Sequence, residues 1–331
     1  MKVCLIGSTG HTGYVLKGLR GQTDADLIGI APGSQGEETE SLLKLAGDYG
    51  YTPIQYQHYT QMLDDLQPDI AAVACHFNDH AAVAIEALNR GIHVFVEKPI
   101  ATTLEDLDLV RAAYDKSNVH LAAMLGIRYE DWFLTVQNLL EERSIGEIRL
   151  MNAQKSYKLG KRSALYTKRE TYGGTIPWVG SHAIDWMHAL SGEKFYSVYA
   201  AHSTKANNGH GDLESTALCH FTFSHEVFGS ATIDYLRPRQ ASSHDDDRIR
   251  IVGTTGVLEA QAGKVLLIND AQPGIREMPL LPKREIFTDF LQQVRGEGPC
   301  KVTAEQSFLV TEACLKARIS ADEGRIVYFE A

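Results

Sequence analysis

Glu97, Lys98 and Pro99 directly follow Val94–Val96, a short run of β-branched and aromatic residues. Such a run suits a strand that is buried on both faces of a parallel sheet. Because Pro99 has no N–H to donate and favours extended geometry in Lys98, the strand should end here with the lysine at its carboxyl end. Open α/β sheets bind their ligands at that edge. The lysine is therefore a candidate ligand-binding side chain, although a charged pair beside a proline can also simply end a strand.

A second candidate feature is the glycine turn Gly7–Gly13, with the sequence GSTGHTG. It lies between an apolar run, Lys2–Ile6, and residues at helical spacing that begin at Tyr14. In the order strand, turn and helix, glycines permit close approach of the backbone, and N–H groups at the helix start face a pyrophosphate. The spacing is GxxGxxG, with Ser8 where GxGxxG has its first glycine. The turn predicts a dinucleotide-binding site.

The residues after the second expected strand, Asp26–Ala31, bear on the choice of cofactor. Sites for NAD(H) place an acidic residue there, on the adenosine ribose, whereas this chain continues with Pro32, Gly33 and Ser34. Without a carboxylate the site should not repel a 2′-phosphate, which favours NADP(H) over NAD(H), although no Arg or Lys stands beside Ser34. Alternatively the segment is only a polar turn, and a more distant basic residue decides.

The remaining sequence pattern predicts two domains. Up to about residue 125, strand and helix patterns alternate, which predicts a doubly wound parallel sheet with right-handed crossovers. Long alternating runs follow and predict an α+β domain with a large, mostly antiparallel sheet. The expected division is a dinucleotide-binding Rossmann domain over 1–122 and a substrate-binding and oligomerisation domain over 123–331. The expected helices are 37–48, 62–66, 79–89, 104–116, 135–142, 184–190, 284–294 and 304–321, and the expected later strands are 69–75, 92–96, 119–125, 147–157, 196–202, 215–223, 227–236, 248–252, 257–261 and 265–268.

Composition narrows the class of protein. A chain of 331 residues is long for one core, and a formal net charge of −10 argues against nucleic acid or an anionic membrane as main partner. The five cysteines include no CxxC pair, which is typical of reduced, buried thiols. With no secretory signal pattern and no apolar span of about 18 residues, we expect a soluble, cytoplasmic protein.

Four stretches spread over the chain resemble the glucose-fructose oxidoreductase, inositol dehydrogenase and MocA family (Gfo/Idh/MocA). They are the glycine turn, Ala81–Pro99 (AAVAIEALNRGIHVFVEKP), Gly173–Asp185 (GGTIPWVGSHAID), and Arg248–Val257 (RIRIVGTTGV) together with Ser320–Arg325 (SADEGR). The resemblance implies an N-terminal Rossmann domain and a C-terminal α/β domain whose open sheet supports homodimers or homotetramers. It also implies NAD(P)-dependent oxidation or reduction of sugars, cyclitols and related small molecules.

The resemblance assigns site residues as well. Lys98 would lie between nicotinamide and substrate, and His182 would be the acid/base residue, with Asp185 one turn further along the same helix face. Hydride transfer requires a titratable group at the substrate oxygen, and an ammonium can stabilise a developing alkoxide. A histidine beside small and apolar residues can instead be a satisfied core side chain. The expected cofactor contacts are Gly7, Ser8, Thr9, Gly10, His11, Thr12, Gly13, Ser34, Cys75, His76, Asn78, His80, Glu97, Lys98 and Arg128.

One position departs from the family pattern. Members that oxidise inositol or glucose carry an aspartate four residues before the histidine, where this chain has Trp178, so the carboxylate that would orient the imidazole is missing. Asp185 could serve in its place, or Lys98 could carry more of the proton transfer. Trp178 could offer a flat apolar wall to a ring-shaped substrate, or be a buried structural indole.

The segment 155–169 contains six basic residues and no acidic one. It could attract a substrate with a carboxylate or phosphate group, or be a solvated loop. No metal is expected, because a further ligand to join His182, Asp185 and His188 is hard to name. The residues 243–247, SHDDD, are expected to form a solvated loop. The expected substrate contacts are Lys98, Tyr157, Lys161, Arg162, Trp178 and His182.

Two classes of function remain open. The favoured one is an NAD(P)-dependent oxidoreductase that acts on a polyhydroxylated or carbonyl-bearing small molecule. The rival is a cofactor-binding regulator or sensor without turnover, which the change at Trp178 favours. Within the enzyme class, reduction of an imine or conjugated double bond is a third possibility, because it needs less help from a histidine and aspartate pair.

Overall fold

The computed structural model describes residues 1–330 and divides the chain into two compact units. The first unit comprises Met1–Gly126, Glu170–Gly173 and Glu285–Thr311, and the remainder forms the second unit. Unlike the single division expected at residue 122, the first unit therefore includes a segment from late in the chain. The aromatic side chains of α9 (Ile286–Val294) account for this, because the rings of Phe287 and Phe290 lie 5.0 and 5.4 Å from that of Phe95.

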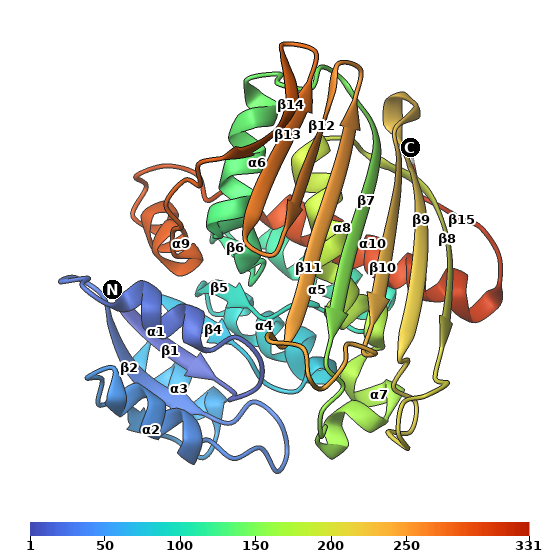
Figure 1. Ribbon diagram of the computed structural model, residues 1–331. Coiled ribbons are helices and arrows are strands. Elements are labelled where there is room, and N and C mark those ends of the chain that lie inside the picture. The colour runs from blue at the N-terminus through green and yellow to red at the C-terminus, as the bar shows by residue number, and fades with distance from the viewer. Residues whose placement is uncertain (331) are drawn as a thin grey trace. The chain divides into compact units, whose positions relative to one another are not determined.

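The first unit contains a six-stranded parallel sheet in the order β3-β2-β1-β4-β5-β6 (Figure 1). The chain moves outward from β1 in both directions, so the predicted doubly wound sheet is confirmed. Strands β1, β4 and β5 are almost wholly buried apolar runs, as expected for a sheet covered on both faces. The strands are β1 (Lys2–Ile6), β2 (Asp26–Ala31), β3 (Ile54–Gln55), β4 (Ile70–Val73), β5 (His93–Val96) and β6 (Leu121–Ala123), and the helices are α1 (Gly13–Leu19), α2 (Glu40–Asp48), α3 (Tyr59–Leu66), η1 (Phe77–Asp79), α4 (His80–Asn89) and α5 (Leu104–Lys116).

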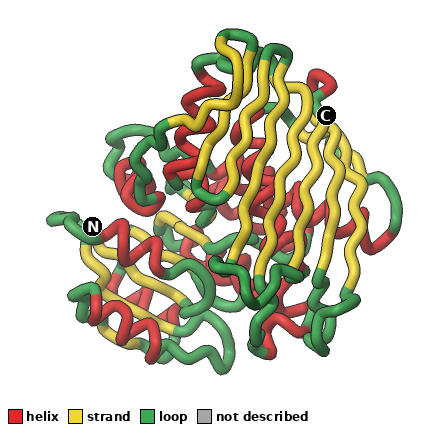
Figure 2. Tube along the Cα trace, in the orientation of Figure 1, coloured by secondary structure: helices red, strands yellow, loops and turns green. Residues whose placement is uncertain are grey.

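The second unit contains a nine-stranded sheet in the order β14-β13-β12-β11-β7-β10-β9-β8-β15, drawn in yellow in Figure 2. Its described strand pairs are antiparallel except β10 with β7, so the expected mostly antiparallel sheet is confirmed. β14 and the short β15 were not predicted. The strands are β7 (Ile148–Tyr157), β8 (Phe195–Ser203), β9 (Thr216–Phe223), β10 (Phe228–Asp234), β11 (Asp245–Gly253), β12 (Gly256–Gln261), β13 (Lys264–Asn269), β14 (Gln272–Met278) and β15 (Val327–Tyr328).

Helices cover one face of the larger sheet. α6 (Asp131–Glu141) packs on β12 and β13, and α8 (Ser181–Ser191) packs on β7 and β10 (Figure 1). α10 (Ala304–Glu323) begins in the first unit and continues in the second. Within residues 1–330, none of the helices combines the length and the hydropathy needed to cross a membrane. The shorter helical segments are η2 (Gly126–Tyr129), η3 (Ala164–Thr167), α7 (Arg169–Tyr172), η4 (Ile176–Gly180) and η5 (Ser224–Glu226).

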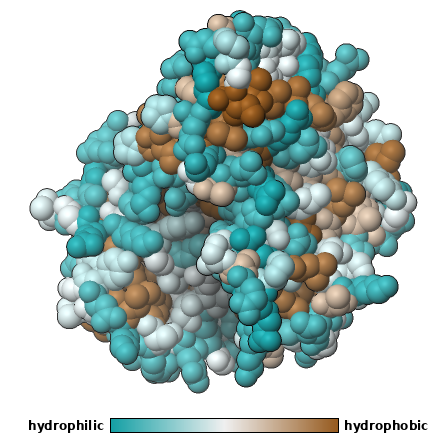
Figure 3. Space-filling view, in the orientation of Figure 1, coloured by the Kyte–Doolittle hydropathy of each residue, from teal (hydrophilic) through white to brown (hydrophobic). Residues whose placement is uncertain are grey.

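The opposite face of the larger sheet exposes apolar side chains among polar ones, as separate patches in Figure 3. One set of cross-strand neighbours runs over five adjacent strands, because Phe228 pairs with Leu150, Leu150 with Val252, Val252 with Val257, and Val257 with Ile268. We call these five residues the apolar row. Phe228, Leu150 and Ile268 are exposed.

The five cysteines are free and buried, as predicted.

Candidate active site

The glycine turn joins β1 to α1 and packs against the ends of β4 and β5. Gly7 and Gly10 have φ values of +93° and +81°, a region that residues with a Cβ rarely adopt. An ideal Cβ on Gly7 would lie 2.3 Å from the backbone nitrogen of Cys75, and one on Gly10 would lie 2.6 Å from Oε2 of Glu97. Both positions therefore require glycine, and the turn is held close to the carboxyl edge of the sheet.

Glu97 ties the glycine turn to the end of β5. Its Oε2 accepts a hydrogen bond from the backbone N–H of His11 (2.7 Å) and lies 2.8 Å from Nδ1 of the same residue. The side chain is fully buried. Burial opposes ionisation, but the charge and hydrogen bonds of His11, together with the charge of Lys98, outweigh it and lower the pKa of Glu97 to about 2. Glu97 is therefore ionised, and it anchors the turn rather than presenting a free carboxylate.

Lys98 lies at the carboxyl end of β5, as predicted, and is 3% exposed. Its backbone N–H donates to Oε1 of Glu97 (3.1 Å), and its Nζ lies 4.0 Å from the same oxygen. A buried ammonium needs such a carboxylate to offset the loss of hydration. One glutamate therefore holds both the glycine turn and the lysine, so the two sequence motifs meet at a single side chain.

Glu37 is a residue of this region that the sequence analysis missed. Its Oε1 accepts hydrogen bonds from the N–H of Ser8 (2.8 Å) and the hydroxyl of Thr9 (3.1 Å). Its Oε2 accepts from the N–H groups of Gly33 (3.0 Å) and Ser34 (3.2 Å). Helix α2 begins at residue 40 rather than at 37, which leaves Glu37 in a loop that turns back toward the end of β1. The expectation that no carboxylate stands in this part of the site is therefore wrong.

The residues that follow β4 have distinct structural roles. The N–H of His76 donates to Oγ of Ser34 (3.0 Å), which links the ends of β4 and β2. The thiol of Cys75 is buried, which raises its pKa. Burial also lowers the pKa of His80, whose two ring nitrogens lie 2.8 and 3.1 Å from main-chain carbonyl oxygens. His80 therefore braces the strand ends, whereas Asn78 is exposed.

The first unit has the features that a nicotinamide dinucleotide requires. The backbone N–H groups of Ser8, Gly33 and Ser34 converge beside the glycine turn, where they donate to the Glu37 carboxylate and so hold an acidic group at the ends of β1 and β2. Thr12 precedes α1, and Gly13 is its first residue. Nothing lies within 4 Å of an ideal Cβ on Gly13, so the backbone there is open to a ligand. The residues present therefore fit the cofactor that the glycine turn predicts.

His182 is the second residue of α8 and is 2% exposed. The five residues before α8, Ile176–Gly180, form a π-helical turn with Pro177 near its start. Such turns are rare and are frequent at functional sites. The prediction that His182 lies early in a helix with Asp185 one turn further on is confirmed, and its role in proton transfer stays a prediction.

Asp185 pairs with Arg128 in the interior of the second unit. The Nε of Arg128 lies 3.0 and 3.1 Å from the two carboxylate oxygens, and its Nη2 lies 2.5 Å from Oδ1. Both side chains are buried, and a guanidinium that donates to both oxygens matches the charge of the carboxylate. The partners are 57 residues apart, so no spacing rule in the sequence indicates the pair. The structure thus joins a predicted catalytic residue to a predicted cofactor contact.

Trp178 packs among aromatic side chains of the second unit. Its ring centroid lies 4.3 Å from that of Tyr166 and 6.1 Å from that of Tyr235, and we call these three residues the aromatic cluster. The guanidinium carbon of Arg162 lies 5.1 to 5.9 Å from all three centroids, within the range of cation–π attraction. The ring of Tyr157 continues the cluster, 6.2 Å from Tyr235. The structure therefore brings together three predicted substrate contacts, Tyr157, Arg162 and Trp178.

Lys155, at the start of the basic segment, is an interior side chain. It is 1% exposed, and its Nζ lies 2.5 Å from Oδ2 of Asp247. Burial lowers the pKa of Lys155 and raises that of Asp247. Residues 245–247 belong to β11, so the expectation that SHDDD forms a solvated loop is wrong for its three aspartates. The buried lysine requires a partner there, which a loop exposed to water would not supply.

The rest of the basic segment is divided between paired and exposed side chains. Arg169 pairs with Glu214, which is buried, and with Asp322. Lys161 is exposed and lies in the same loop as Arg162. Only part of the six basic charges therefore remains to attract an anionic substrate.

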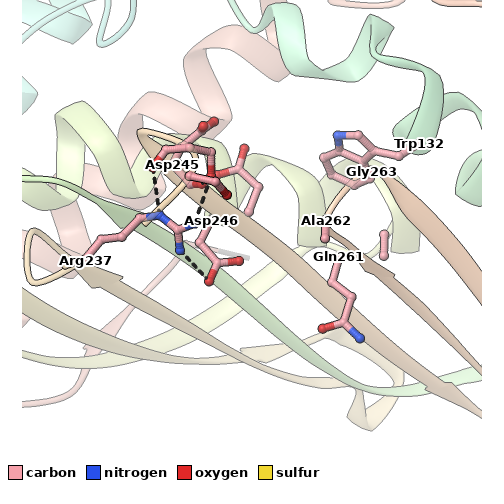
Figure 4. Close-up of a pocket in the computed structure, with 11 residues that line it drawn as sticks. Trp132, Arg237, Asp245, Asp246, Gln261, Ala262 and Gly263 are labelled. Atoms are coloured by element: carbon pink, nitrogen blue, oxygen red, sulfur yellow. Dashed lines mark hydrogen bonds and ion pairs between the residues drawn. The ribbon is translucent and has the colours of Figure 1, made fainter. Parts of the chain in front are cut away.

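A cavity of about 450 Å³ in the second unit contains none of the predicted catalytic or substrate residues. Figure 4 shows Arg237 directed toward Asp246, and their charged atoms are 3.0 Å apart. The other labelled residues around it are Trp132, Asp245, Gln261, Ala262 and Gly263. Of the other aspartates that line it, Asp247 pairs with Lys155. Within residues 1–330, no group of three or more His, Cys, Asp or Glu side chains is placed to bind a metal ion. Nδ1 of His188, which was considered as a ligand, lies 3.0 Å from the main-chain carbonyl oxygen of Glu193.

Two family models match the chain in succession. The model of an oxidoreductase family with an NAD-binding Rossmann fold matches residues 1–124. The model of the GFO/IDH/MocA C-terminal domain matches residues 133–259. The first match covers nearly all of the main segment of the first unit, and the second lies in the second unit except for Glu170–Gly173.

Individual proteins of known structure or sequence are also similar. A putative oxidoreductase from Thermotoga maritima is 52% identical, with a TM-score of 0.96 over 99% of this chain and 100% of that one. A levoglucosan dehydrogenase solved in complex with NADH is 18% identical, with a TM-score of 0.83 over 100% of this chain and 99% of that one, which shows a shared fold alone. An inositol 2-dehydrogenase of Salmonella typhimurium is 28% identical over 45% of this chain and 43% of that protein.

The curated relatives are matched over only part of their length, from 40% to 57% for three of them. The activities in their names therefore describe those proteins and not this chain. The two family models nevertheless match the six-stranded sheet and the strands of the nine-stranded sheet from β7 into β12, in the expected order. The chain belongs to the Gfo/Idh/MocA family of oxidoreductases.

Proposed function

We propose that this protein transfers a hydride between a nicotinamide dinucleotide and a hydroxyl or carbonyl carbon of a sugar, cyclitol or related small molecule. The observation that carries the proposal is the pair of bonds from His11 to Glu97, next to buried Lys98. They hold an ammonium beside the turn where the dinucleotide is expected. A dehydrogenase of inositol and one of levoglucosan among the similar proteins favour a polyhydroxylated substrate.

The dinucleotide, when bound, supplies or accepts the hydride. In the proposed reaction Lys98 stabilises negative charge that develops on the substrate oxygen, because an ammonium held in a dry site acts more strongly there than in water. His182 gives or takes the proton of that oxygen. Asp185, bound by Arg128, positions α8 rather than exchanging a proton itself. In this proposal residues 1–122 bind the cofactor and supply Lys98, and residues 123–331 supply the other substrate contacts.

We propose further that the substrate presents a ring face and an anionic group to the second unit. Trp178 supplies the aromatic surface that stands where other members have an aspartate. Arg162, held over the aromatic cluster, supplies a cation whose orientation is already fixed, which reduces the entropy lost on binding. Lys161 and Tyr157 would complete these contacts.

The alternative is a cofactor-binding regulator without turnover. Trp178 favours it, because it stands where family members that oxidise inositol or glucose have an aspartate before the histidine. Asp185, the carboxylate that could serve in its place, is paired with Arg128. A reductase of an imine or conjugated double bond is the other alternative, in which Lys98 is the main proton donor.

Absorbance at the nicotinamide band, measured with each cofactor over a panel of sugars, cyclitols, sugar acids and keto acids, separates these functions. We expect turnover with at least one polyhydroxylated substrate, faster where the substrate carries a carboxylate or phosphate. Tight cofactor binding with no turnover over the whole panel would favour the regulator. Turnover restricted to unsaturated or imine substrates would favour the third function.

We also propose that the apolar row associates with a second copy of the chain to form a homodimer or homotetramer. Five apolar side chains that cross adjacent strands on an exposed sheet face are a self-complementary surface for a two-fold interface. Sedimentation should give an oligomer for the parent and a smaller species for Phe228→Asp. The control Ile54→Asp, at an exposed residue of β3, should leave the oligomer intact.

A further inference from the structure

We propose that Glu37 determines the choice of cofactor, so that the chain binds NAD(H) and rejects the 2′-phosphate of NADP(H). The inference rests on the proposed function, because it assumes that the glycine turn binds a nicotinamide dinucleotide. It reverses the preference predicted from the sequence, which considered only the residues directly after β2.

The Glu37 carboxylate lies at the edge of the parallel sheet. It bridges the ends of two adjacent parallel strands, because it accepts from Ser8 and Thr9 after β1 and from Gly33 and Ser34 after β2. In dinucleotide-binding sheets the adenosine ribose lies beside these two strand ends, and an acidic residue binds its hydroxyls. Glu37 therefore stands where that acidic residue acts, although it comes from the loop before α2 rather than from the end of β2.

The carboxylate of Glu37 is held firmly in this position. Three of its four donors at 3.2 Å or less are main-chain N–H groups, which cannot rotate away as side chains do. The Oγ of Ser34, in turn, accepts from the N–H of His76 at the end of β4. An incoming ligand would thus meet a fixed negative charge at this place.

The loop residues around Glu37 carry only negative charge. Sites that select NADP(H) hold the 2′-phosphate with arginine or lysine. The loop from 32 to 40 has the sequence PGSQGEETE, which contains three glutamates and no basic residue. A 2′-phosphate would add like charge beside Glu37 with no cation in this loop to offset it, whereas a ribose hydroxyl could replace the Thr9 hydroxyl as a donor to the carboxylate.

The test is a calorimetric measurement of Kd for NAD⁺ and NADP⁺ with the parent, Glu37→Gln and Glu38→Gln. Glu38→Gln is a matched control, because Glu38 is exposed and its substitution removes the same charge one residue away from Glu37. We expect the parent to prefer NAD⁺ on the order of a hundredfold, since like-charge contacts cost several kcal/mol. Glu37→Gln should narrow the preference about tenfold or more through tighter NADP⁺ binding, and Glu38→Gln should change it less than about threefold.

If the parent binds NADP⁺ as tightly as NAD⁺ or more tightly, the inference is overturned without any variant. The N–H groups that bind Glu37 would then bind the phosphate instead. Equal effects of the two substitutions overturn it as well, because general loop charge rather than Glu37 would decide. If the folded parent binds neither cofactor, the proposed function itself fails. Binding of NAD⁺ with an unchanged preference in Glu37→Gln leaves the proposed function standing and removes only this inference.

Discussion

The acidic side chains of the two units are held in different ways. In the first unit Glu37 and Glu97 accept hydrogen bonds from main-chain N–H groups of the glycine turn and its neighbours. In the second unit Asp185 is bound by the side chain of Arg128. The first arrangement depends on backbone geometry that a short motif specifies, and the second depends on side chains far apart in the sequence.

The comparison predicts that residues held by backbone geometry can be changed with little loss of fold, while arginine-paired residues cannot. Lys98→Met should show the largest effect on activity, a fall in kcat of about 10²–10³-fold, the range for losing one group that stabilises negative charge in the transition state. Cofactor affinity should stay near that of the parent, because the bonds of Glu97 to His11 remain. Steady-state kinetics with a substrate from the panel provides the measurement. A variant as fast as the parent would remove Lys98 from the reaction.

Asp185→Asn should have the largest effect on stability. It leaves the Arg128 guanidinium buried without its carboxylate, which costs about 3–5 kcal/mol of unfolding free energy. Urea denaturation measures the change. The double variant Arg128→Met with Asp185→Leu should recover much of the loss, since apolar replacement of a buried pair is often tolerated. If the single and double variants are equally unstable, the pair is not what stabilises α8.

Glu97→Gln should change the response of stability to acid. The pKa of Glu97 is lowered to about 2 because the charge and hydrogen bonds of His11 outweigh burial, so its folded pKa lies below its unfolded value of 4.5. Its contribution is therefore complete above about pH 4.5 and is lost as the pH falls toward 2. Urea denaturation at several pH values should show a shallower loss over this window in the variant than in the parent. Parallel curves would mean that His11 does not stabilise the ionised carboxylate.

Arg162→Met should have the smallest of these effects. Loss of the cation over the aromatic cluster should raise KM for an anionic substrate on the order of tenfold and leave kcat nearly unchanged. Lys168→Met, at an exposed residue of the same basic segment to which no substrate contact is assigned, is the control and should change KM less than threefold at moderate salt. Equal effects would indicate attraction by the overall charge of the loop, and no effect in either variant would exclude an anionic substrate group.

The parts predicted from the sequence are those with a local signature. The apolar run before Lys98, the glycine turn and the helix that carries His182 each depend on residues within a few positions of one another. β14 was missed because it is an edge strand with a proline, a glycine and mostly exposed side chains, so it has no alternating apolar pattern.

The missed site residues share a different cause. Glu37 reaches the glycine turn through a loop whose path no periodicity specifies, and it satisfies donors 28 and 29 residues earlier in the chain. Lys155 looked like one of six surface charges, yet alternation along β7 turns it inward, where Asp247 of the neighbouring β11 offsets its charge. Such pairings depend on strand register, which becomes visible only in the folded chain.

The most direct test of the account is a crystal structure of the parent with NAD⁺ and a substrate from the panel. The account predicts that Nζ of Lys98 and the imidazole of His182 both lie within about 3.2 Å of the reacting substrate oxygen, or reach it through one water, beside the nicotinamide ring. A complex in which these two groups face separate surfaces, or in which side chains fill the glycine turn and exclude the dinucleotide, would contradict it.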